Sequence, residues 1–81
     1  MGNIEIDVHG LRTLEAIDKI AEIVQKAGTG VYRIRIIHGY HGGTKIRSAI
    51  REEFGYGREE KVKRIEMGAN EGITELVLRE Y

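Results

Sequence analysis

The sequence lacks cysteine and proline, and it contains no long hydrophobic run. The absence of cysteine excludes disulfides and thiolate metal sites, and it agrees with a reducing cytoplasm, which is the location we expect. No stretch is long and apolar enough to span a membrane, and no signal-peptide pattern opens the chain. Because proline is absent, the 11 glycines supply the sharp turns.

The sequence also lacks an excess of charge of either sign. Lysine and arginine together number 13, as do aspartate and glutamate, so the formal net charge is zero. This balance argues against a strongly basic protein that wraps nucleic acid, but it leaves room for a local basic patch. The length of 81 residues predicts one domain over residues 1–81, with a core that needs no crosslink.

Apolar residues recur in patterns that predict six elements in the order βαβαββ. Strict alternation of apolar and polar residues predicts strands, and apolar spacings of three and four predict amphipathic helices. Thr13 is the expected N-cap of the first helix, and Gly28 is the expected residue just after its end. The strands are predicted at residues 3–9, 31–37, 61–67 and 73–79, and the helices at residues 13–27 and about 44–54.

This order of elements predicts an α/β chain of the two-layer α+β kind. Each βαβ unit implies two parallel strands with a right-handed crossover. The short last connection implies an antiparallel hairpin or a return to a near neighbour. Because the strands alternate, the two helices are expected to cover one face of the sheet only.

The open face of the sheet is predicted to carry charged side chains that pair across the strands, each pair worth less than about 1 kcal/mol. Four apolar residues fall on this face by parity and are expected to form a small patch suited to a protein partner or a dimer. The mixed charges discourage stacking of sheets, so we expect a monomer. The charged positions are Glu5, Asp7, Arg33, Arg35, Arg64, Glu66, Glu75 and Arg79, and the apolar ones are Ile37, Val62, Ile73 and Val77.

A glycine-rich stretch joins the second predicted strand to the second predicted helix. Such a turn aims backbone N–H groups at the space above the helix N-terminus, which suits a phosphate. Basic residues occupy the first turns of this helix and acidic residues its end, the reverse of what the helix dipole prefers. A tight turn that needs glycine, with solvated basic side chains, explains the same residues equally well. The predicted phosphate-binding residues are Gly39, Tyr40, His41, Gly42, Gly43, Thr44, Lys45 and Arg47.

The ends of the first two strands bring together groups that can transfer protons. Asp7 and His9 are two residues apart, so both project from one face of the strand, roughly 7 Å apart. Ligands of open parallel sheets bind beyond the carboxyl ends of the strands, where His38 and His41 are also expected. Histidine acts as acid or base near neutral pH, and a carboxylate can orient it or bind a metal ion. We predict that Asp7, His9 and His38 are catalytic, and we leave a divalent ion open.

Simpler roles compete for the same residues. An aspartate or histidine at a strand end often caps a neighbouring turn. Alternation sends His38 with Ile36 toward the helices, so His38 joins the site only if the chain twists at its strand end. A zinc site is disfavoured, because no helical histidine pair and no thiolate is present. Ser48 lies inside a predicted helix without the turn that a serine nucleophile needs.

Three short motifs stand in order along the chain: Ile-Asp-Val-His-Gly at 6–10, Arg-Ile-Ile-His-Gly at 35–39 followed by Ile-Arg at 46–47, and Asn-Glu-Gly-Ile-Thr at 70–74. The first resembles the Leu-Asp-x-His motif of the Smr domain, the small MutS-related domain that occurs alone or at the C-terminus of the second bacterial MutS family. The second resembles the family's His-Gly-x-Gly or Thr-Gly-x-Gly loop that leads into a helix, and the third resembles its closing hairpin. The resemblance covers essentially the whole chain.

The resemblance implies a two-layer βαβαββ fold, similar to the C-terminal domain of a bacterial translation initiation factor, with the last strand of a mixed sheet antiparallel to the rest. It also implies binding of DNA or structured RNA, often with nicking or RNA-cleaving activity. By motif, Asp7 and His9 are the acid–base or metal-linked residues, Gly39 is the close-approach glycine, and Arg47 is a phosphate contact. The chain departs from the pattern at the motif's second glycine, where His41 stands in a loop about one residue longer. A non-catalytic module that binds nucleic acid or ribosome-associated RNA is therefore the alternative to an endonuclease.

Overall fold

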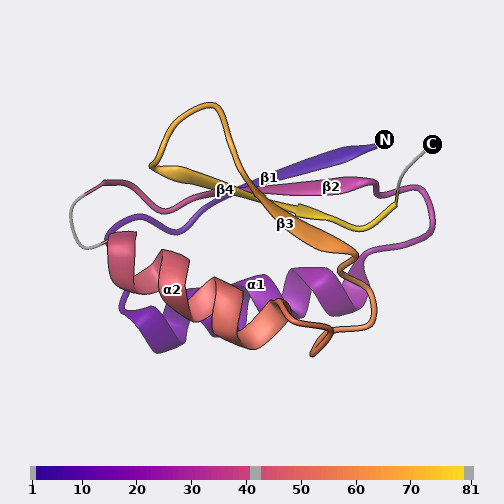
Figure 1. The fold of residues 1–81 in the computed structure, drawn as a ribbon, viewed down its shortest axis with the longest axis horizontal. Coiled ribbons are helices and arrows are strands. Elements are labelled where there is room, and N and C mark those ends of the chain that lie inside the picture. Colours follow the sequence, from indigo (N-terminus) through magenta and orange to yellow (C-terminus); the bar gives the residue numbers. More distant parts are fainter. Residues whose placement is uncertain (1, 41–42, 80–81) are drawn as a thin grey trace.

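The computed structural model describes residues 2–40 and 43–79, and it has two layers (Figure 1). Two helices lie side by side on one face of a four-stranded sheet, and no helix in the described part is long and apolar enough to cross a membrane. The predicted order βαβαββ is confirmed. The elements are β1 (Asn3–Asp7), α1 (Thr13–Lys26), β2 (Arg33–Ile37), α2 (Gly43–Phe54), β3 (Arg64–Met67) and β4 (Ile73–Val77).

The sheet has the strand order β1-β2-β4-β3. β1 and β2 run parallel with Ile4 opposite Ile34, whereas β4 runs antiparallel to both of its neighbours, with Leu76 opposite Ile34 and Ile65. The sheet is therefore mixed, and β4 runs antiparallel to the other strands, as the resemblance implied. Because β4 lies between β2 and β3, the turn from β3 into β4 reaches the edge of the sheet where β2 ends.

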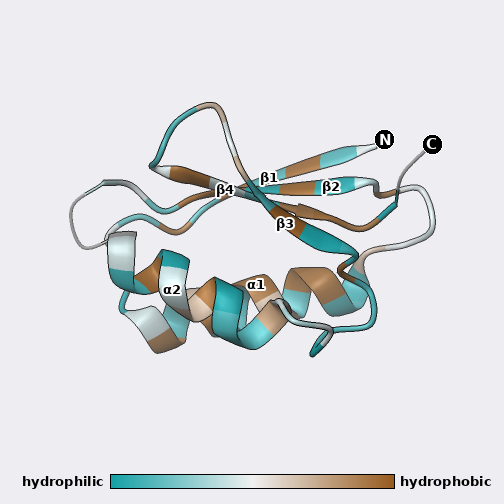
Figure 2. Cartoon of the chain, in the orientation of Figure 1, coloured by the Kyte–Doolittle hydropathy of each residue, from teal (hydrophilic) through white to brown (hydrophobic). Residues whose placement is uncertain are grey.

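The core lies between the sheet and the two helices. Ile20 of α1, Ile50 of α2 and Leu76 of β4 are completely buried, together with Ile34 and Ile36 of β2. These are the residues that the two apolar periods placed on the inner faces. Figure 2 shows hydrophobic and hydrophilic residues interleaved along both helices. Burying one such apolar side chain stabilises the fold by about 1.5–3 kcal/mol.

The structure corrects several predicted element ends. β1 ends at Asp7 rather than His9, because the Asp7 carboxylate accepts a hydrogen bond from the His9 backbone N–H at 3.0 Å and the chain turns there. The N-cap of α1 is Arg12 rather than Thr13, and the Arg12 N–H donates to Glu15 Oε1 at 3.1 Å. The C-cap of α1 is the extended residue Ala27, so Gly28 is the residue just after the helix end, as predicted, although its φ is not positive.

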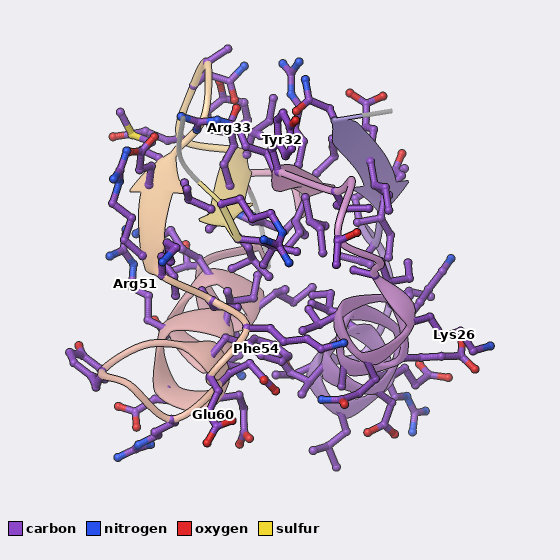
Figure 3. All side chains as sticks on the ribbon, turned by 90° about the vertical axis from the view of Figure 1, so that its right-hand side faces the viewer. Lys26, Tyr32, Arg33, Arg51, Phe54 and Glu60 are labelled. Atoms are coloured by element: carbon purple, nitrogen blue, oxygen red, sulfur yellow. The ribbon has the colours of Figure 1, made fainter. Side chains whose placement is uncertain are left out.

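The open face of the sheet carries the predicted lattice of charges. Arg33 of β2 lies 2.8 Å from Glu75 on the neighbouring strand β4 and 2.9 Å from Glu66 on β3, one strand further, and Arg35 lies 3.7 Å from Glu5 on β1. Figure 3 shows Arg33 on this side of the sheet, away from the helices. The charges of this face therefore largely neutralise one another.

The prediction of an exposed apolar patch on the open face is wrong for three of its four residues. Val62, Ile73 and Val77 are all buried. Val62 precedes β3, so the alternation of the strand does not determine which way its side chain faces, and it packs into the core. Ile73 is covered by the turn at Gly68, where an added Cβ would lie 2.4 Å from Ile73 Cγ2. Val77 lies between two arginines of the adjacent strands, whose stems shield apolar neighbours. With the patch removed, a monomer stays our prediction for sedimentation measurements.

Candidate functional site

Four segments meet where β1 and β2 end, at the edge that we call the rim. They are residues 7–10 after β1, residues 38–40 after β2, the start of α2, and the turn at residues 70–72 before β4. The ladder continues past β1 through a hydrogen bond from the Val8 N–H to the Ile37 carbonyl, at 2.9 Å. The N–H groups of His38 and Gly39 both donate to the Gly72 carbonyl, at 2.9 and 3.0 Å. Backbone hydrogen bonds therefore tie the end of β2 both to the segment after β1 and to the turn before β4.

Asp7 and His9 form a hydrogen-bonded pair on the outside of the rim. His9 Nδ1 lies 2.6 Å from Asp7 Oδ1, and the two side chains are 68% and 52% exposed. The hydrogen bond from the His9 ring, followed by the one from the His9 backbone, lowers the pKa of Asp7 below its ordinary value. Asp7 is thus a carboxylate at neutral pH and holds the ring through Nδ1. Nε2 is the ring nitrogen that this arrangement leaves for a ligand.

His38 lies beneath the rim instead of beside this pair. Its side chain is 1% exposed, with Nδ1 at 3.0 Å from the Gly39 carbonyl and Nε2 at 2.8 Å from the Thr74 hydroxyl. A carbonyl can only accept, so Nδ1 carries the proton and Nε2 accepts from Thr74. Burial, and to a smaller extent the charge of Arg47, lowers the pKa of His38. The inward direction given by simple alternation was the correct one.

The burial of neutral His38 makes the stability of the fold depend on pH. Because the pKa of His38 is lower in the folded state than its ordinary value near 6.5, the unfolded state binds the extra proton first. The contribution of neutral His38 to the free energy of unfolding is complete above about pH 6.5. This contribution is lost as the pH falls toward the pKa of His38 in the folded state. Between pH 8 and pH 5, the melting temperature should therefore fall more steeply for the wild type than for His38→Gln. The other two histidines are common to both proteins, so parallel slopes would contradict the assignment.

Glycines at 39 and 72 let two backbones approach each other at the rim. Gly39 has φ +83°, a left-handed conformation that disfavours any Cβ. A Cβ on Gly39 would lie 3.6 Å from His9 Cβ, and one on Gly72 would lie 3.4 Å from the Gly39 backbone. The Gly72 N–H donates to Asn70 Oδ1 at 2.8 Å, which closes the turn before β4. Gly39 is therefore the point where the Asp7–His9 pair meets the rest of the rim.

Next to Gly39, the rim has a small hollow of about 110 Å³ at the start of α2. Gly39, Tyr40, Thr44, Arg47 and Glu71 line it, and the Tyr40 side chain is 58% exposed. The first turn of α2 contains no acidic residue, so the positive end of the helix dipole is not offset there. Arg47, the helix end and the backbone of Gly39 give the hollow the character of an anion site, while Glu71 supplies one opposing charge.

The structure unites some predicted phosphate-binding residues and separates others. Gly39, Tyr40, Thr44 and Arg47 share the hollow, and Gly43 is the first residue of α2. Lys45 is exposed but does not line the hollow. His41 and Gly42 lie outside the described residues. Within residues 2–40 and 43–79, no three histidine, aspartate or glutamate residues are grouped to hold a metal ion. The contact of Asp7 with the His9 ring is the one that the orienting role requires.

Two residues of this region belong to the third sequence motif but were not predicted as site residues. Glu71 lines the hollow, and Thr74 is the buried partner of His38. Both belong to the hairpin between β3 and β4, and they reach the rim only because β4 pairs antiparallel with β2, which puts Thr74 opposite Ile36. The available signal was the alternation of Thr74 with Leu76 and Leu78, which puts a polar residue on the inner face of the strand.

Comparisons with known proteins agree with the geometry. A model of the Smr domain family matches residues 6–74. Among solved structures, the chain is similar to the crystal structure of the Smr domain of Thermus thermophilus MutS2, with a TM-score of 0.81 and 28% sequence identity. The similarity covers 95% of this chain and 99% of that one. No curated protein sequence matches the chain.

Proposed function

The chain belongs to the Smr domain family, and we propose that its rim binds nucleic acid and cleaves a phosphodiester, as a nicking or structure-selective endonuclease on DNA or RNA. The observation that carries the proposal is the exposed Asp7–His9 pair, which adjoins the Arg47 hollow at Gly39. A proton acceptor and an anion site next to each other are what phosphodiester hydrolysis requires.

Each group has a role in this proposal. His9 Nε2 takes the proton from the attacking water or hydroxyl, and Asp7 keeps the ring in the correct tautomer and stabilises the imidazolium that forms. The P–O bond to the leaving oxygen breaks, and this oxygen takes a proton from solvent water. Arg47 and the N-terminus of α2 stabilise the negative charge that grows on the phosphate oxygens. His38, whose two ring nitrogens are engaged inside the protein, is a positioning residue that holds the Gly39 turn.

A cleavage assay tests the enzymatic part of the proposal. Purified protein is incubated with end-labelled single-stranded, duplex and branched DNA and with structured RNA, each with and without a divalent metal ion. We expect cleavage of at least one of these substrates at a rate that scales with protein concentration. Intact substrates under all conditions would contradict an endonuclease.

A second candidate is a module that binds nucleic acid without cutting it. It is favoured by the interior position of His38, which leaves His9 as the exposed histidine of the described rim, and by His41 in place of the motif's second glycine. The module predicts binding by a wild type that cuts nothing, and binding that His9→Ala leaves unchanged. Loss of cleavage with retained binding in His9→Ala distinguishes the endonuclease from the module.

Arg47→Ala is expected to weaken nucleic-acid binding by a similar factor for all sequences, because a phosphate contact carries no base information. The slope of the logarithm of affinity against the logarithm of salt concentration should fall by about one unit. Fluorescence anisotropy over a salt series measures both quantities. Lys26→Ala is the matched control, because Lys26 lies at the far end of α1 (Figure 3). A folded Arg47→Ala protein with wild-type affinity and slope would remove the hollow from the binding surface.

A further inference from the structure

A second hollow lies at the opposite end of α2 from the rim. It measures about 330 Å³ and lies between the C-terminal turn of α2 and the start of β3. The buried Phe54 and Val62 line it together with three basic residues, Arg51, Lys63 and Arg64, and no acidic residue takes part. In a chain of zero net charge, such a grouping is a local excess of positive charge.

Arg64 is paired with Glu66, so the uncompensated part of this excess is carried by Arg51 and Lys63. Arg51 and Lys63 make no ion pair with any described residue, whereas the arginines of the open sheet face are paired with glutamates. Glu52, the neighbour of Arg51 along α2, is engaged by Arg58 at 3.2 Å. The hollow is therefore complementary to a negatively charged ligand.

Arg51 also connects this hollow to the rim. Thr44, Arg47 and Arg51 are spaced by three and four residues, so they follow one flank of α2. The first two line the rim hollow and the third lines the second hollow. Figure 3 shows Arg51 on the side of α2 that lies next to β3, while Lys26 extends from α1 on the opposite side of the molecule. A basic flank thus runs from one hollow to the other.

Tyr56 supplies a flat apolar surface at the second hollow. Its side chain is 81% exposed, so packing within the fold does not account for it. Its φ of 56° is a left-handed conformation that is rarely adopted by aromatic residues and that costs roughly 1–2 kcal/mol. Strain of this kind is retained where surrounding structure holds it and often accompanies a binding role.

We propose that the second hollow binds an unpaired nucleotide of the nucleic acid held at the rim, with Tyr56 stacking on the base and Arg51 and Lys63 contacting its phosphate. The proposal rests on nucleic-acid binding at the rim and extends it to a substrate class, namely strands with a single-stranded stretch beside the bound phosphodiester. Thr44 and Gly55 are eleven residues apart, which corresponds to roughly 16 Å along the helix and to about five stacked nucleotides. Aromatic stacking on bases with basic contacts to the backbone is how proteins hold single strands.

Amide NMR spectra of the wild-type chain locate the contacts. The chain is titrated with an oligothymidylate of about twelve nucleotides, and the result expected is a set of shifts both at residues 39–47 and at residues 51–64. Shifts at the rim alone overturn this inference and leave the proposed function standing. Shifts at the second hollow alone contradict binding at the rim and overturn the inference that one strand joins the two hollows, and no shifts at either overturn both. Shifts that follow protein concentration rather than oligonucleotide show self-association and overturn the inference.

Two variants then test the roles of the side chains. Tyr56→Asn keeps a residue that tolerates the left-handed conformation, and it is expected to lower affinity for the oligothymidylate roughly fivefold or more while leaving affinity for a blunt duplex of the same length unchanged. Arg51→Gln should weaken binding of both. The controls are Leu14→Ala, an exposed apolar side chain of α1, and Lys26→Gln. Unchanged single-strand affinity in Tyr56→Asn, or an equal loss in the controls, would overturn the proposal.

Discussion

His9→Ala is expected to lower the rate of phosphodiester cleavage by roughly 10²- to 10⁴-fold, the usual contribution of a positioned acid–base group. The His9 side chain is 68% exposed, contacts the Asp7 carboxylate and lies outside the hydrophobic core. The substitution therefore removes the proton acceptor without opening a cavity. Affinity for nucleic acid should change little, because in our account the phosphate is held by Arg47 and the start of α2.

The experiment compares single-turnover cleavage rates, affinity and melting temperature for the wild type and the variant. His38→Gln serves as the companion, since it alters a buried histidine and is expected to lower stability more than the chemical step. A His9→Ala protein that cuts at the wild-type rate would exclude His9 from the reaction. A variant that has lost both cleavage and its folded melting transition would point to a structural role.

Asp7→Asn is expected to have the second largest effect, a loss of at least about tenfold in cleavage rate. The lowered pKa of Asp7 shows that the fold holds it as an anion hydrogen-bonded to the His9 ring. An amide of the same shape keeps the hydrogen bond to the His9 backbone N–H but supplies no charge to stabilise the imidazolium. The rate should therefore fall while the fold and the affinity stay close to wild type.

Glu5→Gln is the matched control for Asp7→Asn. Glu5 is an exposed carboxylate on the same face of β1, two residues before Asp7, and it lies near Arg35 rather than near a histidine. If removing either carboxylate lowers the rate equally, the effect of Asp7 is general electrostatics rather than orientation of His9. A rate in Asp7→Asn equal to that of the wild type would remove the pair from the mechanism.

The sequence predicted the layers of this fold because two apolar periods were strong. Alternation through Ile34 and Ile36 and the helical spacing of Ile20 and Val24 both matched the buried residues. The predicted strands were longer than the real ones, since alternation in sequence continues past the last ladder hydrogen bond. Val62 shows the cost of extending parity beyond a strand end: it was assigned to the open face and packs in the core.

The rim was predictable in part for the same physical reason. The sequence placed Asp7 and His9 together at a strand end, but on one strand roughly 7 Å apart; they are 2.6 Å apart because β1 ends at Asp7 and the chain turns toward it at His9. The hollow at Arg47 lies where a glycine-rich turn before a helix was predicted. The contact of His38 with Thr74 depends on a strand order that no local pattern encodes, with β4 inserted between β2 and β3. The position of Glu71 in the hollow depends on the same long-range pairing.

The most direct test of the rim is the position of a bound phosphodiester in a crystal structure of the chain with an oligonucleotide that resists cleavage. We predict a backbone phosphate over the N-terminus of α2, within hydrogen-bonding distance, about 3 Å, of the Arg47 guanidinium and the backbone around Gly39, with His9 facing the same phosphate. An oligonucleotide that lies instead across the charged open face of the sheet, with no phosphate at Arg47 or His9, would contradict the account.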